Sequence, residues 1–313
     1  MSIIVETNSF GNFESSKPRA TIIPVSFECS KKPKKGTRNG AQAILNASLH
    51  LSPFDDEVMA DISKLGINTY NFIDLSATEA ESKEPFRLIE KAVKFSIIDG
   101  SIPFLIGGEG AISYAAVKSL YDLYPDISVI HFSSRTKLNI AAENKFDSRN
   151  SMGLLFESMP DVNIVNIGVR STTEKEIVFA EENNLDLYYA GDKKNWDLSE
   201  ILSKLTKNVY ISFDCSVLDS SMVPSVSYPE PNGLSFNECL NILKNICAYK
   251  EVLGIDFVEF SPIENLVAAD ITIAKLIYKT IGYTFAEDLG LFDEQEDAAE
   301  DESEDETILI NDL

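Results

Sequence analysis

The chain has 313 residues, 44% hydrophobic and 25% charged, which is enough for one large α/β domain or two small ones. It contains no uninterrupted run of about 18 apolar residues, so we expect no membrane-spanning helix, and its start does not read as a signal peptide. The net charge of −23 disfavours nucleic acids and anionic membranes as partners.

Short apolar runs rich in β-branched residues alternate with amphipathic segments along the chain. The apolar runs predict buried strands at 20–27, 103–106, 127–132, 162–169, 185–189, 209–213 and 252–257. The amphipathic segments predict helices at 41–51, 84–99, 111–123, 174–183, 199–207, 237–249 and 268–280. This order predicts an α/β fold, with a mostly parallel sheet covered by helices on both faces.

The sequence predicts three parts: an N-terminal extension (1–18), a body (19–286) and an acidic tail (287–313). Thirteen acidic residues and no Lys or Arg follow Phe285. The low-complexity run 293–306 predicts disorder, because like charges repel and few apolar residues are present to pack. The apolar end, 308–313, is either a frayed terminus or a peptide that docks on a partner.

The four cysteines show no metal-binding or disulfide spacing, which favours reduced thiols in a cytoplasmic protein.

In parallel sheets, ligands bind beyond the carboxyl ends of the strands. The chain places a set of charged and small polar residues after the second, third, sixth and seventh predicted strands: Glu109, Gly110, Ser133, Arg135, Lys137, Asp214, Ser216 and Glu259. These residues define the candidate site.

The segments around these residues resemble the ureohydrolase (arginase/agmatinase/formiminoglutamase) family in order and spacing, over about residues 20–285. The matching segments are Gly107-Gly108-Glu109-Gly110, His131-Phe132-Ser133-Ser134-Arg135, Ser212-Phe213-Asp214-Cys215-Ser216, Pro229-Glu230-Pro231-Asn232-Gly233 and Asp256-Phe257-Val258-Glu259. Gly36-Thr37-Arg38-Asn39-Gly40 is also agmatinase-like. The resemblance implies a three-layer α/β/α fold of the arginase type with a central sheet of about eight strands.

The resemblance also implies a pair of Mn²⁺ ions, which in the family activate a water for attack on a guanidinium carbon. The positions that match the family's six metal ligands are Gly110, Ser133, Arg135, Lys137, Asp214 and Ser216. Only Asp214 keeps a ligand side chain. The guanidinium of an arginine does not deprotonate in a protein, and the ammonium of a lysine has no lone pair to offer a metal. This pattern predicts that the site binds no manganese and that no cofactor is needed.

Positive side chains at these positions suggest a different use of the site. We expect Arg135 and Lys137, or one of them, to form ion pairs with Asp214 and Glu259, because an unpaired buried carboxylate is costly. Together with Glu109, these four residues are also the candidates for binding a small charged ligand.

The sequence disfavours Cys215 and Ser133 as nucleophiles. Cys215 should point away from Asp214 into the packing of sheet and helix, as strand alternation requires. Ser133 lacks a base other than Lys137.

The main functional hypothesis from the sequence is a catalytically inactive member of the family, regulating or stabilising a homo-oligomer (trimer or hexamer) or a hetero-oligomer with an active paralogue. The alternative is a divergent agmatinase- or arginase-like amidinohydrolase that releases urea from a guanidino substrate. A third possibility is a protein that binds a small charged ligand in the same site.

Overall fold

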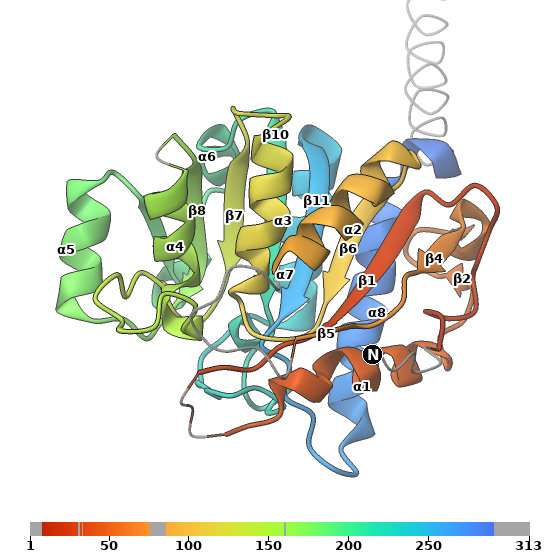
Figure 1. Cartoon of the computed structure of the whole chain (residues 1–313), viewed down its shortest axis with the longest axis horizontal. Coiled ribbons are helices and arrows are strands. Elements are labelled where there is room, and N and C mark those ends of the chain that lie inside the picture. Colours follow the sequence, from red (N-terminus) through yellow and green to blue (C-terminus); the bar gives the residue numbers. More distant parts are fainter. Residues whose placement is uncertain (1–7, 31, 33, 76–85, 160, 291–313) are drawn as a thin grey trace, which may run out of the picture.

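One nine-stranded sheet forms the centre of the protein in the computed structural model, which describes residues 8–30, 32, 34–75, 86–159 and 161–290 (Figure 1). All seven predicted strands are present, with ends shifted by no more than one residue. They are β1 (Ala20–Ser26), β6 (Ile102–Ile106), β7 (Ser128–Phe132), β8 (Asn163–Val169), β9 (Asp186–Tyr189), β10 (Asn208–Asp214) and β11 (Glu251–Val258).

The strand order β4-β1-β6-β11-β10-β7-β8-β9 places the strands that carry the site next to one another, and β5 pairs with β1 beside β4. Every strand pair in this sheet is parallel. Register pairs Phe257 with Ile106 and Phe213 with both Phe257 and Phe132. The carboxyl ends of β6, β11, β10 and β7 therefore meet at one edge, as parallel pairing requires.

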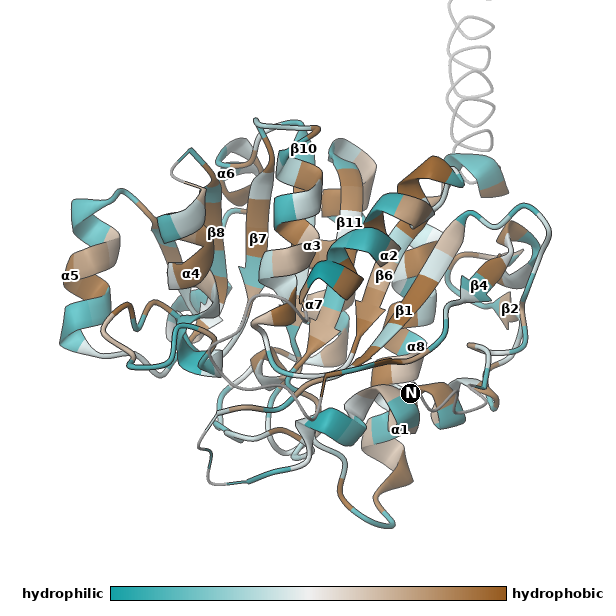
Figure 2. Cartoon of the chain, viewed as in Figure 1, coloured by the Kyte–Doolittle hydropathy of each residue, from teal (hydrophilic) through white to brown (hydrophobic). Residues whose placement is uncertain are grey.

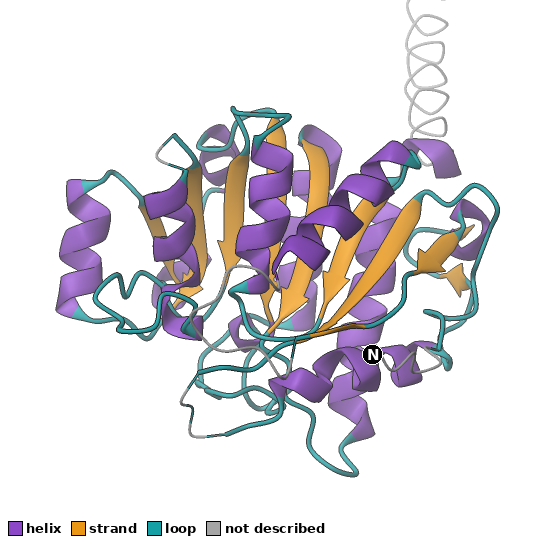
Figure 3. Ribbon diagram, viewed as in Figure 1, coloured by secondary structure: helices purple, strands orange, loops and turns teal. Residues whose placement is uncertain are grey.

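Helices cover both faces of the sheet, so the three-layer α/β/α prediction is confirmed (Figure 3). The described helices are α1 (Gly40–Ser48), α2 (Phe86–Ile98), α3 (Ile112–Tyr121), α4 (Ser151–Ser158), α5 (Glu174–Glu182), α6 (Leu198–Ser203), α7 (Phe236–Tyr249) and α8 (Val267–Thr284). Two of them begin with capping boxes, Thr173 with Glu176 on α5 and Ser235 with Glu238 on α7, which satisfy backbone N–H groups that a helix start leaves free.

Two hydrophobic cores lie on the two faces, because successive strand residues point to opposite sides. On β1, Ile22 belongs to the core that also contains apolar side chains of α1, α6, α7 and α8. The next residue, Ile23, belongs to the core formed with α2, α3 and α4. The apolar strands run between these helix layers in Figure 2.

Several elements were missed by the sequence prediction. The short strands β2 (Phe54–Asp55), β3 (Ala60–Asp61), β4 (Ile67–Thr69) and β5 (Ile73–Asp74) are two or three residues long, too short to show a period. Helix α4 contains only eight residues, and its pattern was also missed. The sheet has nine strands rather than about eight because β4 and β5 both pair with β1.

The predicted acidic tail lies outside the described residues, apart from 287–290. Residues 8–18 of the predicted N-terminal extension are described, and Phe10 in them is fully buried. Within the described part of the chain, no helix has both the length and the apolar character needed to cross a bilayer.

Candidate active site

The site lies where four central strands end, and its charged groups come from separate parts of the chain. Glu109 follows β6, Lys137 follows β7, Asp214 ends β10 and Glu259 follows β11. A fifth charged residue, Lys32, enters from the segment between β1 and α1. All five side chains are almost completely buried.

Lys137 and Asp214 form the inner ion pair of the site. The Lys137 Nζ lies 3.0 Å from Asp214 Oδ2 and 3.5 Å from Glu259 Oε1. Asp214 also accepts hydrogen bonds from the Ser133 hydroxyl (3.0 Å) and the Ser216 backbone N–H (2.8 Å). Lys137 thus contacts both carboxylates, as the sequence led us to expect.

Glu259 lies between two ammonium groups. Its Oε2 is 2.6 Å from Lys32 Nζ, and its Oε1 accepts a hydrogen bond from the Gly110 backbone N–H at 3.0 Å. Lys137 approaches the same Oε1. The carboxylate is therefore held from both sides by positive groups and an oriented N–H.

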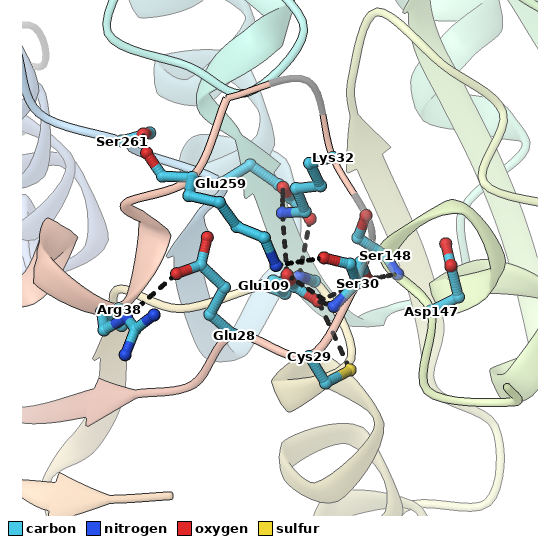
Figure 4. A network of polar contacts seen from close by, with 12 residues as sticks. Glu28, Cys29, Ser30, Lys32, Arg38, Glu109, Asp147, Ser148, Glu259 and Ser261 are labelled. Atoms are coloured by element: carbon cyan, nitrogen blue, oxygen red, sulfur yellow. Dashed lines mark hydrogen bonds and ion pairs between the residues drawn. The ribbon is translucent and has the colours of Figure 1, made fainter. Parts of the chain in front are cut away.

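Glu109 shares Lys32 with Glu259. Its Oε1 lies 3.2 Å from Lys32 Nζ, and the Ser30 backbone N–H and hydroxyl donate to its carboxylate, the hydroxyl at 2.5 Å (Figure 4). Burial raises the pKa of Glu109, and the nearby Glu259 acts in the same direction, while Lys32 opposes both.

The five charges form an alternating series, Glu109–Lys32–Glu259–Lys137–Asp214. Burial by itself lowers the pKa of a lysine, but the carboxylates outweigh it and raise the pKa of both lysines. Burial would raise the pKa of Asp214, but Lys137, His131 and the Ser216 hydrogen bonds lower it. The two ammonium groups and Asp214 therefore stay charged at neutral pH.

The backbone is unusual at two of these residues. Lys137 has φ 57° and Glu259 has φ 64°, a left-handed conformation that costs energy in residues with a Cβ. Such conformations cluster at functional sites, where the surrounding structure imposes them. Both residues direct a charged side chain into the site from this conformation.

Arg135 does not join these ion pairs, so Lys137 is the one of the two expected cations that contacts Asp214 and Glu259. Its guanidinium pairs with Glu230 at 2.6 Å and lies over the Tyr228 ring, 4.4 Å from the centroid. Its side chain is 26% exposed, so its positive charge is stabilised both by water and by residues of the loop after β10. The guanidinium is larger than an ammonium, and the loop residues Glu230 and Tyr228 offer a partly solvated partner, which costs less than burial.

The small residues at the remaining predicted positions fill the space between the strand ends. The Ser134 hydroxyl donates to the Ser216 hydroxyl at 2.8 Å. A Cβ on Gly110 would lie 3.1 Å from the Ser151 hydroxyl oxygen and 3.6 Å from Glu259 Oε1. A side chain at Gly110 would therefore enter the site itself.

The disfavoured nucleophile is placed as expected. Cys215 is fully buried in the core on the α7 and α8 face, and burial raises its pKa well above the ordinary thiol value. The His131 Nδ1–H donates to the side-chain oxygen of Asn166 at 2.7 Å, and burial lowers the pKa of His131 to about 4, so the ring is neutral at neutral pH. Neither residue is an activated nucleophile or a charged acid.

Lys32 was missed by the sequence analysis. The signal that points to it is the run Lys31-Lys32-Pro33-Lys34-Lys35, directly before the agmatinase-like Gly36-Thr37-Arg38. A basic run is ordinarily a solvated surface feature, and nothing in its spacing shows which lysine turns inward. Contact with Glu259, 227 positions later in the chain, exists only in the folded protein.

Comparison with known proteins identifies the family. The model of the arginase family matches residues 18–282. The chain is 32% identical over 268 residues to an N(1)-aminopropylagmatine ureohydrolase of Thermus thermophilus, covering 84% of this chain and 89% of that protein. An agmatinase of Pyrococcus horikoshii is 28% identical, with coverage of 83% and 90%.

Solved structures share the fold. The agmatine ureohydrolase of Thermoplasma volcanium superposes with a TM-score of 0.80 at 20% identity, covering 90% of this chain and 96% of that one. A formiminoglutamase of Trypanosoma cruzi, solved with Mn²⁺, has a TM-score of 0.76 at 19% identity, with coverage of 88% and 96%.

These relatives correct two expectations. The hypothesis that the protein is catalytically inactive is contradicted, because relatives at 28–32% identity are named as ureohydrolases and agmatinases. The alternative hypothesis of an amidinohydrolase fits these relatives better. The expectation of a manganese-free protein is also contradicted by the comparisons, since a neighbour with the same fold was solved with Mn²⁺. Counting lost ligands in the sequence was not enough to decide either question.

In this arrangement, the carboxylates of the site are paired with ammonium groups and are not free to hold a pair of Mn²⁺ ions. In the described residues, no group of three or more His, Cys, Asp or Glu side chains is gathered that could hold a metal ion. The ammonium groups of Lys32 and Lys137 contact the carboxylates of Glu259 and Asp214. An ammonium group has no lone pair with which to bind a metal ion.

The family match over residues 18–282, the parallel sheet with helices on both faces, and the cluster of charged residues at its strand ends agree with one another: the chain belongs to the arginase family.

Proposed function

We propose that the protein is a divergent ureohydrolase that hydrolyses the guanidino group of a linear cationic substrate, of the agmatine or aminopropylagmatine type. The names of relatives that align with 83–84% of the chain support this activity. In the reaction, the oxygen of water bonds to the guanidino carbon and a carbon–nitrogen bond breaks. One molecule of urea and one amine are released.

The observation that carries the proposal is the position of Glu259 at the carboxyl end of β11. Its two oxygens already hold the ammonium of Lys32 and the N–H of Gly110. A guanidinium presents paired N–H donors that match a carboxylate in geometry and charge. Glu259 would orient the guanidino group, and Glu109 would add a second negative charge beside it.

Asp214 and Lys137 are the acid–base pair nearest to Glu259. Asp214 is held ionised and can accept a proton from the attacking water. Its Oδ2 contacts both the Ser133 hydroxyl and the ammonium of Lys137. Lys137 is held protonated and can give a proton to the departing amine. Exclusion of water around these buried groups strengthens their electrostatic effect.

Urea release from the purified protein tests the activity. Agmatine and N(1)-aminopropylagmatine are supplied separately, with the protein dialysed against chelator or supplied with Mn²⁺. We expect urea with at least one substrate, and a loss of roughly 10²-fold or more in Asp214→Asn and Glu259→Gln.

The matched control is Glu230→Gln, which removes a carboxylate bound to Arg135 at the rim of the site. Its urea release should stay within a few fold of the unmodified protein. The proposal is wrong if the folded protein releases no urea from either substrate under both metal conditions.

The predicted assembly is a separate question. Homo-oligomers of three or six chains, a hetero-oligomer with a paralogue and a cytoplasmic location stay predictions from the family resemblance. Size-exclusion chromatography with light scattering would measure the assembly directly.

A further inference from the structure

Lys32 holds the position that a cationic substrate needs. Its Nζ contacts both Glu259 (2.6 Å) and Glu109 (3.2 Å), and its side chain is completely buried. Figure 4 draws Lys32 together with Glu109 and Glu259 and marks the ion pairs between them with dashed lines. The ammonium of Lys32 thus already satisfies the two negative groups to which we assign the guanidinium of the substrate.

We infer that Lys32 is a built-in competitor for the substrate: a guanidinium or alkylammonium ligand binds between Glu109 and Glu259 only when the ammonium of Lys32 leaves. This inference rests on the proposed use of Glu259 for a cation. It assigns to Lys32 a role in affinity and specificity, and it makes Glu109 a second ligand of the substrate cation.

Charge balance explains why the occupant has to be a cation. If Lys32 left and nothing replaced it, two buried carboxylates would face each other, and among the described residues the remaining ion pair of the two would be that of Glu259 with Lys137 at 3.5 Å. Leaving such charges unpaired is strongly unfavourable. A neutral ligand would not replace the positive charge that Lys32 supplies to both carboxylates. Exchange of one positive group for another therefore selects cationic substrates.

The segment that carries Lys32 is anchored by other residues, so it can be separated from the lysine itself. Lys34 Nζ donates to the Ser261 carbonyl at 2.6 Å, and Lys35 Nζ donates to the Ser30 carbonyl at 2.6 Å. The Gly36 N–H donates to Glu28 at 2.8 Å. These contacts hold the segment without occupying the carboxylates of the site.

Calorimetric titration with agmatine and with methylguanidine tests the inference. We expect Lys32→Gln to bind both ligands about 10- to 100-fold more tightly than the unmodified protein, the gain expected when a binding-competent state populated at about 1–10% becomes the main one. The matched control is Lys34→Gln, which loosens the same segment and leaves Lys32 in place. Its affinity should stay within about threefold of the unmodified protein.

Two results would overturn the inference. One is an affinity of Lys32→Gln equal to or weaker than that of the unmodified protein. The other is an equal gain in Lys34→Gln, which would assign the effect to the segment and not to the ammonium. Tighter binding without urea release would keep Lys32 as a competitor and reject the proposed hydrolase activity, so the two failures are distinguishable.

Lys32→Gln leaves two buried carboxylates with fewer positive partners and lowers the stability of the fold. A second variant and a second measurement therefore separate ligand binding from folding. Lys32→Gln with Glu109→Gln removes one charge of each sign and keeps Glu259 for the ligand; it should also bind more tightly than the unmodified protein. In the unmodified protein, acetic anhydride labelling of Lys32, read by mass spectrometry against Lys34, should increase severalfold with methylguanidine. Unchanged labelling up to a saturating concentration would contradict displacement.

Discussion

The ammonium of Lys137 lies 3.0 Å from a carboxylate oxygen of Asp214, and neither side chain is more than 2% exposed. Two positions earlier in the chain, Arg135 points toward Glu230 at the rim and is 26% exposed. Both residues replace residues that the family resemblance assigns to metal binding, yet burial gives them different energetic roles.

Lys137→Met should lower the free energy of unfolding by about 3–5 kcal/mol, because it leaves Asp214 and Glu259 buried with less compensation. Arg135→Met should cost only about 1 kcal/mol, because its pair with Glu230 is partly solvated. Urea unfolding at pH 7 measures both. Equal losses in the two variants would show that burial of the Lys137 pair is not what matters.

The stability should depend on pH through Asp256, which accepts hydrogen bonds from Tyr210 (2.8 Å) and Ser212 (3.0 Å). Burial raises the pKa of Asp256 from 3.8 to about 6. Between these two values the folded protein holds a proton that the unfolded chain lacks, so stability falls as pH rises from about 4 to about 6. The loss is on the order of 3 kcal/mol.

Asp256→Asn removes this titration. The free energy of unfolding of the unmodified protein, minus that of the variant, should decrease between pH 4 and pH 6 and be level from pH 7 to pH 8. A difference that is constant over the whole range would mean that Asp256 has an ordinary pKa in the folded protein.

Gly107→Ala should destabilise the protein far more than Gly100→Ala. Both glycines have positive φ, 91° and 76°, which costs an alanine about 1 kcal/mol. A Cβ on Gly107 would also lie 2.6 Å from the Cβ of Ala41 and 2.7 Å from its backbone nitrogen, whereas nothing lies within 4 Å of a Cβ on Gly100. We expect about 1 kcal/mol for Gly100→Ala and at least about 3 kcal/mol for Gly107→Ala by urea unfolding. Similar losses would argue against close packing of α1 on the end of β6.

The cysteines should be unreactive in the folded protein. Burial raises the pKa of Cys29 and of Cys247 to about 12, and it raises those of Cys215 and Cys239 as well. At pH 8 a thiol with a pKa near 12 has about a thousandfold less thiolate than an ordinary one. Ellman's reagent should therefore react slowly until the protein is unfolded in urea. One rapidly reacting thiol in the folded state would reopen the question of a cysteine nucleophile.

The sequence by itself determined the architecture. Apolar runs of four to eight residues alternate with amphipathic segments, and burial of both sets allows little besides a parallel sheet between two helix layers. Because parallel strands end at one edge, the positions of Glu109, Asp214 and Glu259 after their strands also determined that these three carboxylates would meet. Elements of two or three residues, such as β4 and β5, carry no period and were not predictable.

The tertiary structure decided which cations those carboxylates bind. Lys137 and Arg135 are two positions apart and both positively charged, but only Lys137 is buried against Asp214, while Arg135 is held by Glu230 and Tyr228. Lys32 and Glu259 are 227 positions apart, and their contact depends on how the segment after β1 folds over the strand ends. A charge pattern specifies which side chains can pair, whereas packing and the cost of removing each one from water select the pairs that form.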